Sequence, residues 1–115
     1  MRHTEENTQI QCVRWFAYQY PHFSLLLHHS PNGGFRNITE AVRFKQMGTR
    51  KGFPDLVLLV PAKGYHGLFV EMKATKGKQS DEQKQYQKAV ENVGYKYVLC
   101  RSIERFIAQV NDYLR

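Results

Sequence analysis

Three charged side chains border the two apolar runs in residues 51–73, KGFPDLVLLVPAKGYHGLFVEMK. Asp55 begins the first run, and Glu71 with Lys73 ends the second. Two carboxylates can hold Mg²⁺, a hard cation that prefers a few oxygen ligands and keeps several of its waters. Such a metal activates a bound water, and a lysine can orient that water and offset developing negative charge. The trio therefore suits phosphodiester hydrolysis, although charged residues at strand ends are often only solvated.

Strand periodicity predicts that these three side chains share one face of a sheet. Side chains alternate between faces with period two, so Glu71 and Lys73 must point the same way. The AKGYH connection centres a hairpin near residue 63 or 64, and antiparallel pairing about that centre places Asp55 opposite Glu71 or Lys73. A slip of one residue would separate the three groups. We therefore expect the hairpin to gather two carboxylates and an ammonium at one end.

The elements that position this hairpin follow from apolar periodicity and from capping and turn residues. Thr4 can cap the first helix, and Ser80 with Gln83 forms a capping-box pattern before the third. The order is that of a mixed α/β domain around one small sheet. Helices are expected at 5–20, 38–47, 81–92 and 102–114, and strands at 23–29, 55–61, 67–73 and 95–100.

Length and composition favour one globular domain over residues 1–115. Apolar residues make up 42% of the 115 and charged residues 23%, as in ordinary soluble proteins. No apolar run approaches the roughly 20 residues of a membrane-spanning helix, and no secretory signal is visible at the N-terminus. Cys12 and Cys100 lie far apart and have no metal-type spacing. We expect reduced core thiols in a cytoplasmic protein.

The formal net charge of +7 favours a polyanionic partner, usually a nucleic acid. The basic residues gather in RFKQMGTRK and KATKGK, on either side of the hairpin. The alternative is that the charge serves only solubility. The position of the two basic segments beside the carboxylates makes DNA or RNA the preferred interpretation.

Three segments together resemble the VRR-NUC family of the PD-(D/E)XK nuclease superfamily: HHSPNGGFR, MGTRKGFPDLVLL and GLFVEMKATKGKQSDEQKQY. The resemblance spans nearly the whole chain, and its short form is similar to the phage and prophage-encoded members. It implies a restriction-endonuclease-like α/β core and an endodeoxyribonuclease that uses Mg²⁺ or Mn²⁺. It also implies a homodimer that acts on branched DNA such as Holliday junctions.

The resemblance assigns roles to the charged trio of the hairpin. Asp55 of PDL matches the metal-binding aspartate of the family, and Glu71 of EMK matches the second ligand. Lys73 matches the catalytic lysine. The backbone carbonyl of Met72 would be a further metal ligand.

Two more site residues follow from the same resemblance, each with an alternative. Gln83 of SDEQ matches a glutamine that faces the site, but its side chain can also close the capping box of the helix. The family has a glutamate on its first helix that reaches the metal. We assign it to Glu6, with Glu5 as the close alternative, and a carboxylate there can instead simply favour the helix N-terminus.

Candidate DNA contacts lie in the glycine-rich segment and in the two basic segments. Asn32 and its neighbouring glycines allow the backbone to approach a phosphate, which Arg36 could bind bidentately. Contacts to phosphates position DNA but carry little sequence information, so we expect selectivity for shape. The flanking candidates are Lys45, Arg50, Lys51, Lys76 and Lys78.

The first helix has more aromatic surface than one buried stripe needs. Its surplus could line the interface of a symmetric dimer, or one or two tyrosines could simply be exposed. The main functional alternative is a non-catalytic nucleic-acid-binding module with a nuclease-like core. The intact aspartate, glutamate and lysine argue against it. The aromatic residues concerned are Trp15, Phe16, Tyr18 and Tyr20.

Overall fold

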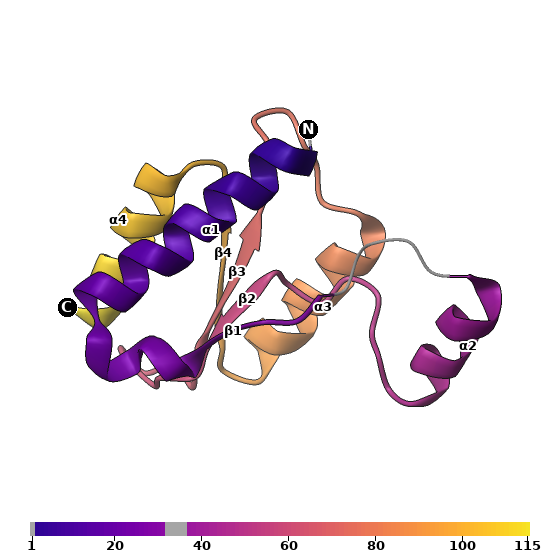
Figure 1. Cartoon of the computed structure of the whole chain (residues 1–115). Coiled ribbons are helices and arrows are strands. Elements are labelled where there is room, and N and C mark those ends of the chain that lie inside the picture. Colours follow the sequence, from indigo (N-terminus) through magenta and orange to yellow (C-terminus); the bar gives the residue numbers. More distant parts are fainter. Residues whose placement is uncertain (1, 32–36) are drawn as a thin grey trace.

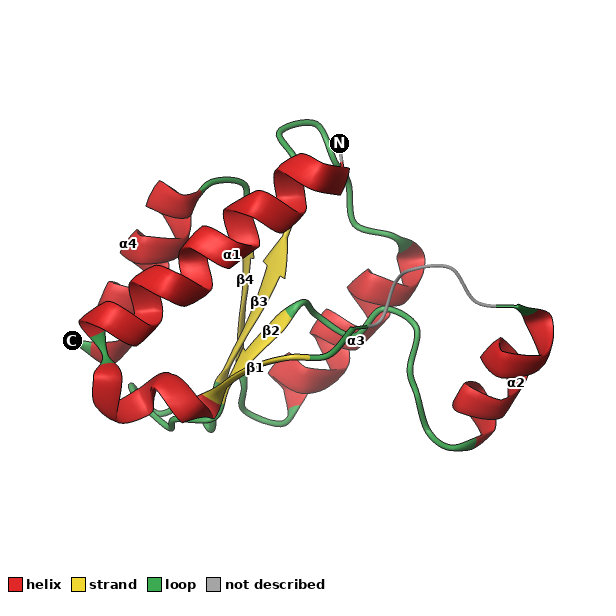
Figure 2. Ribbon diagram, viewed as in Figure 1, coloured by secondary structure: helices red, strands yellow, loops and turns green. Residues whose placement is uncertain are grey.

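The computed structural model describes residues 2–31 and 37–115 of the chain. Its helical elements are α1 (Arg2–Gln19), the 3-10 helix η1 (Pro21–Leu26), α2 (Ile38–Gln46), α3 (Asp81–Asn92) and α4 (Ile103–Leu114). Helices α1 and α4 cover one face of a central sheet and α3 covers the other, whereas α2 stands away from the sheet (Figures 1 and 2).

The sheet contains four strands in the order β1 (Leu27–His29), β2 (Leu56–Leu58), β3 (Leu68–Met72) and β4 (Lys96–Cys100). β1 pairs with β2, and β2 with β3, in antiparallel fashion, whereas β3 and β4 run parallel. Parallel neighbours need a crossover connection, and α3 lies in that connection. This mixed α/β arrangement confirms the predicted fold class.

Each face of the sheet carries its own hydrophobic core. Val70 of β3 packs in the core that contains Phe16 of α1 and Phe106 of α4. Phe69, its neighbour in the strand, packs in the core that contains Val90 of α3. This alternation shows that β3 is buried on both faces. The odd-numbered residues of β3 lie on the face that α3 covers.

The segment predicted as a strand over 23–29 is mostly helical. Element η1 extends through Leu26, and only Leu27–His29 pair with β2. Pro21 occupies the start of η1, where its fixed φ angle favours a helical turn. The apolar run that follows it lacks alternation, so periodicity alone could not separate a short helix from a strand.

The three later helices begin at side-chain caps. The Asn37 side chain accepts from the backbone N of Glu40 at 2.8 Å, and Ser102 caps α4. Ser80 caps α3 as predicted. The first helix differs, since it begins at Arg2 rather than after a cap at Thr4. None of the helices in the described part of the chain has the length and apolar character needed to cross a membrane.

Candidate active site

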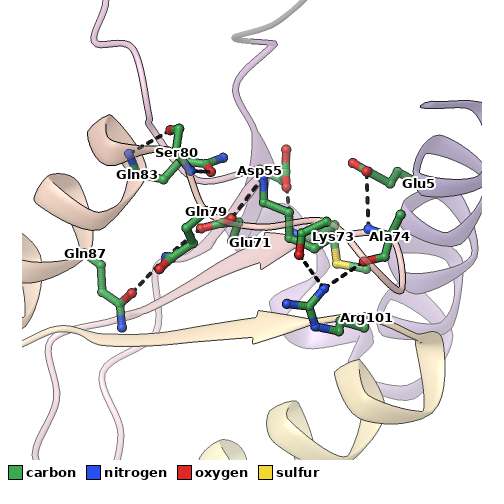
Figure 3. A network of polar contacts seen from close by, with 12 residues as sticks. Glu5, Asp55, Glu71, Lys73, Ala74, Gln79, Ser80, Gln83, Gln87 and Arg101 are labelled. Atoms are coloured by element: carbon green, nitrogen blue, oxygen red, sulfur yellow. Dashed lines mark hydrogen bonds and ion pairs between the residues drawn. The ribbon is translucent and has the colours of Figure 1, made fainter. Parts of the chain in front are cut away.

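The register of the β2–β3 hairpin brings Asp55 to the end of β3. Leu56 pairs with Val70, so continuing the ladder by one residue sets Asp55 opposite Glu71. Oδ2 of Asp55 accepts a hydrogen bond from the backbone N of Met72 at 2.6 Å (Figure 3). The aspartate carboxylate is therefore fixed on the backbone that carries the second carboxylate.

Glu71 is the buried carboxylate of the site, with no exposed surface. Its Oε1 accepts hydrogen bonds from the Tyr97 hydroxyl and, at 3.0 Å, from Nε2 of Gln79. Its Oε2 lies 3.4 Å from Nζ of Lys73, and no described residue gives that oxygen a hydrogen bond. One oxygen is thus held by the protein, and the other is directed toward the lysine (Figure 3).

Electrostatics disfavour the charged form of Asp55. Burial raises the pKa of its carboxyl, the hydrogen bond from Met72 lowers it, and the negative charges of Glu71 and Glu5 raise it again. His29, whose Nδ1 lies 2.7 Å from the Asp55 carbonyl oxygen, also lowers it. The net result is a raised pKa, and a cation placed among these carboxylates would relieve their repulsion.

Glu5, rather than the predicted Glu6, reaches this edge of the sheet. Oε2 of Glu5 accepts a hydrogen bond from the backbone N of Ala74 at 3.2 Å (Figure 3), and the side chain is half-buried. It also lines a small pocket of about 40 Å³ together with Lys73. Glu6 is exposed. Consecutive helical residues point about 100° apart, so the rotation of α1 that turns Glu5 toward the sheet leaves Glu6 on an exposed side.

The donor groups fit a hard divalent cation. Asp55 and Glu71 supply carboxylate oxygens, and Oε2 of Glu71 is a buried oxygen without a hydrogen bond. Mg²⁺ is usually bound through one or two carboxylates and several waters. Among the side chains of residues 5–31 and 37–115, no three from His, Cys, Asp or Glu gather closely enough to hold a metal ion by themselves. Water and backbone carbonyls, such as that of Met72, would have to complete the coordination.

The side chain of Gln83 closes the capping box of α3. Its Oε1 accepts from the backbone N of Ser80 at 2.8 Å, and Oγ of Ser80 accepts from the backbone N of Gln83 at 3.1 Å. The glutamine that contacts Glu71 is Gln79, which also donates to Oε1 of Gln87 at 2.9 Å (Figure 3). Of the two roles predicted for Gln83, capping the helix or facing the site, the structure therefore shows the capping role.

Two residues that hold Glu71 escaped the sequence prediction. Tyr97 shares the face of Phe69 and Glu71 because β4 runs parallel to β3, with Phe69 paired to Tyr97. That pairing could not be read from the sequence, since a strand pattern does not name its partner. Gln79 lies in the loop before α3, where no periodicity indicates direction.

The predicted DNA contacts that the structure describes are all exposed, whereas Asn32 and Arg36 lie outside the described residues. Nζ of Lys51 lies 3.9 Å from Oε2 of Glu82. The other exposed candidates are Lys45, Arg50, Lys76 and Lys78.

Arg101 holds the loop that carries Lys76 and Lys78. Its Nη1 donates to the carbonyl oxygen of Ala74 at 2.8 Å (Figure 3). It also donates to the carbonyl oxygens of Gly77 at 2.7 Å and Thr75 at 3.2 Å. An arginine that binds three carbonyl oxygens within four residues restrains the backbone of this loop. Arg101 is a third residue that sequence reasoning missed.

Comparisons with known proteins identify the family of the chain. A family model described as the VRR-NUC domain matches residues 1–104. A solved structure described as a "VRR_NUC domain protein" shares 29% sequence identity, with a TM-score of 0.85 over 96% of this chain and 88% of that chain. None of the curated proteins matches the chain. The predicted placement among PD-(D/E)XK nucleases fits these matches, and the chain belongs to the VRR-NUC family of nuclease-type domains.

Proposed function

We propose that the protein is a metal-dependent endonuclease that hydrolyses DNA phosphodiester bonds. One observation carries the proposal: Asp55, Glu71 and Lys73 meet at one end of the β2–β3 hairpin. Glu71 is buried and its charge is paired with Lys73, but its Oε2 has no hydrogen bond, and buried charges of this kind are typically paired or bind a metal. Membership of a nuclease-type family supports the same conclusion.

Each residue of the trio has a distinct task in this proposal. Asp55 and Glu71, with the Met72 carbonyl and Glu5 nearby, would hold Mg²⁺ or Mn²⁺. When bound, such an ion supplies a water of lowered pKa and neutralises charge on the phosphate. Lys73, whose side chain is 16% exposed, can reach the substrate. It orients the attacking water and stabilises the negative charge that develops on the phosphate.

Three neighbouring residues keep these groups in place. Tyr97 and Gln79 fix Oε1 of Glu71, which leaves Oε2 to face Lys73. Gln83 acts through the α3 N-terminus, where it orders the segment that carries Gln79. Loss of a supporting hydrogen bond of this kind typically costs about 10–100-fold in metal affinity or activity.

The substrate we propose is branched DNA, with a four-way junction as the clearest example. The exposed lysines and arginines on both sides of the hairpin would contact phosphates, which favours recognition of shape over sequence. A homodimer would place two such sites for symmetric cuts. On α1, Tyr18 is 86% exposed, Ile10 48% and Val13 39%. These side chains are available for a partner subunit, whereas Trp15 packs inward.

The test is cleavage of labelled four-way junctions and linear duplexes in Mg²⁺, Mn²⁺ or EDTA. We expect cutting with either metal, none in EDTA, and faster cutting of the junction. Lys73→Ala should abolish cutting while DNA binding persists. Lys96→Ala is the matched control, because Lys96 is also half-buried but lies at the start of β4, at the other end of the sheet. Binding without cleavage in every metal would favour the non-catalytic module.

A further inference from the structure

A larger pocket lies beside the active site, among the end of β1, α2 and α3. Its volume is about 380 Å³, which is within the usual size of small-ligand sites. Aromatic rings, a guanidinium and hydroxyl groups share its wall. The residues that matter here are Phe44, Phe53, Tyr86, Arg50, Ser30 and Thr49.

The pocket wall continues into the strands that carry the carboxylates. Phe53 precedes Asp55 by two residues, and its ring centroid lies 5.1 Å from that of Tyr86. The Phe53 ring also meets the Phe69 ring edge-on at 5.7 Å. Phe69 precedes Glu71 by two residues on the same face of β3. A group held against Phe53 and Tyr86 would therefore sit next to the bond that the site cuts.

Gly52 lets the loop that carries Phe53 pack closely against α3, which carries Tyr86. Its φ angle is +90°, and a Cβ there would lie 2.7 Å from the carbonyl carbon and oxygen of Glu82 and 2.9 Å from the backbone N of Gln83. The loop backbone thus lies directly on the first turn of α3. Because the loop carries Phe53 and the helix carries Tyr86, this contact holds the two rings of the wall close to each other.

The chemistry of this wall is that of a nucleobase site. Aromatic rings stack on the flat face that every base presents, and an arginine can stack on a base or bind the adjoining phosphate. A base inside a regular duplex is already stacked between neighbours and cannot enter. A base without a partner at a branch point has lost much of that stacking, and its entry is correspondingly easier.

We propose that this pocket receives an unpaired nucleobase of the DNA, beside the scissile phosphate. The inference rests on the proposed function in taking DNA as the partner. It also names residues that could make the protein select branched DNA. Phosphate contacts alone would select DNA only by its shape. Arg50, one of the exposed basic candidates, then acts at the pocket rather than as a general phosphate contact.

The test measures base capture without cleavage. A four-way junction carries one 2-aminopurine at an unpaired position next to the branch, and a fully paired duplex carries the same label. Both are titrated with the full-length protein in EDTA. Neighbouring bases quench 2-aminopurine, so its fluorescence should rise when the wild-type protein draws it out of the stack. The paired label should change little.

Substitutions in the pocket test whether it causes the rise in fluorescence. Tyr86→Ala and Phe44→Ala should each lose the fluorescence rise and weaken binding of the junction by about tenfold or more, the usual effect of removing a ring that stacks on a base. Binding of the paired duplex should stay the same. Tyr86→Phe keeps the ring and should behave like the wild type. Tyr65→Ala, which removes an exposed tyrosine of the connection between β2 and β3, outside both the pocket and α1, is the matched control.

The outcomes separate this inference from the proposed function. An equal loss of affinity for both DNAs in the Tyr86 and Phe44 variants, or an unchanged fluorescence rise, would overturn the pocket even if the protein cuts junctions. A pocket-dependent rise in a protein that never cuts with Mg²⁺ or Mn²⁺ would support the pocket and contradict the nuclease. Failure to bind either DNA would contradict both. Circular dichroism of each variant checks that the fold persists.

Discussion

The hydroxyl of Tyr97 on β4 donates a hydrogen bond to Oε1 of the fully buried Glu71 on β3. Burial, together with this hydrogen bond, raises the pKa of Tyr97 far above its ordinary value, so the phenol remains a donor at any working pH. Gln79 donates to the same oxygen. The carboxylate is thus anchored on one side only, which leaves Oε2 for Lys73 and for the proposed metal ion.

Replacing Tyr97 with phenylalanine tests this anchor. The variant Tyr97→Phe leaves Oε1 with Gln79 alone, and loss of a hydrogen bond to a buried charged group should lower the free energy of unfolding by about 1–3 kcal/mol. The less rigid carboxylate should also need more Mg²⁺ for half-maximal cleavage. Urea unfolding and a metal titration measure the two effects. Tyr65→Phe is the control, and an unchanged metal requirement would show that Tyr97 only stabilises the core.

The two neighbouring glutamates of α1 provide a matched pair. Glu5→Gln removes a negative charge near Asp55 and weakens the contact with Ala74. We expect it to reduce cleavage at limiting Mg²⁺ by about tenfold, as loss of an outer-shell group does in other metal sites. Glu6→Gln, on the exposed side of the helix, should cleave like the wild type. Normal cleavage by Glu5→Gln with impaired cleavage by Glu6→Gln would reverse the assignment.

Substitutions at Gly52 and Gly64 distinguish the effect of close packing from that of backbone strain. Both have positive φ angles, +90° and +85°, so alanine is strained at either position. Only at Gly52 would the new Cβ meet backbone atoms within 3 Å, whereas nothing lies within 4 Å at Gly64. Gly52→Ala should therefore lower the free energy of unfolding by about 1–3 kcal/mol more than Gly64→Ala does. Equal losses in urea unfolding would mean that the loop does not pack tightly on α3.

Arg101→Ala tests whether the loop of Lys76 and Lys78 must be held in place. The variant removes three hydrogen bonds to loop carbonyls. We expect weaker DNA binding and a smaller salt dependence of the binding constant, because the two lysines would no longer face the phosphates together. Binding measured at several salt concentrations checks this. Arg115→Ala, at an exposed residue of the C-terminus, is the control for the lost charge.

The two buried cysteines give a pH-dependent prediction. Burial raises the pKa of Cys12 to about 12 and that of Cys100 to about 11, from an ordinary value of 9.0. Both thiols should therefore react slowly with iodoacetamide at pH 8 in the native protein and rapidly in urea. Unfolded thiols ionise near pH 9 while folded ones stay protonated, so their contribution to stability is lost as the pH rises from about 9 toward 12. Rapid alkylation of the native protein would contradict this burial.

The hairpin and its charged residues could be predicted because they depend on local rules. Period-two alternation placed Glu71 and Lys73 on one face, and the position of the turn set Asp55 opposite them. Capping residues located α3 just as directly: Ser80 and Gln83 form the expected box. These signals lie within a few residues of the elements they define.

The remaining site residues depend on tertiary structure. Tyr97 reaches Glu71 only because β3 pairs in parallel with β4. The same pairing brings Arg101, which follows β4, next to the loop that follows β3. The choice between Glu5 and Glu6 depends on how α1 is rotated against the sheet, which no local pattern fixes. The sequence therefore predicts the chemical groups of the site better than the residues that hold them.

The most direct test of the account is a crystal of the protein soaked in Mn²⁺, examined by anomalous scattering. We predict one strong peak between the carboxylates of Asp55 and Glu71, with Lys73 beside the coordinated water. The same crystal of Asp55→Asn should show that peak weakened or absent. A peak elsewhere on the molecule, or no peak at these carboxylates at saturating Mn²⁺, would contradict the proposed metal-dependent site.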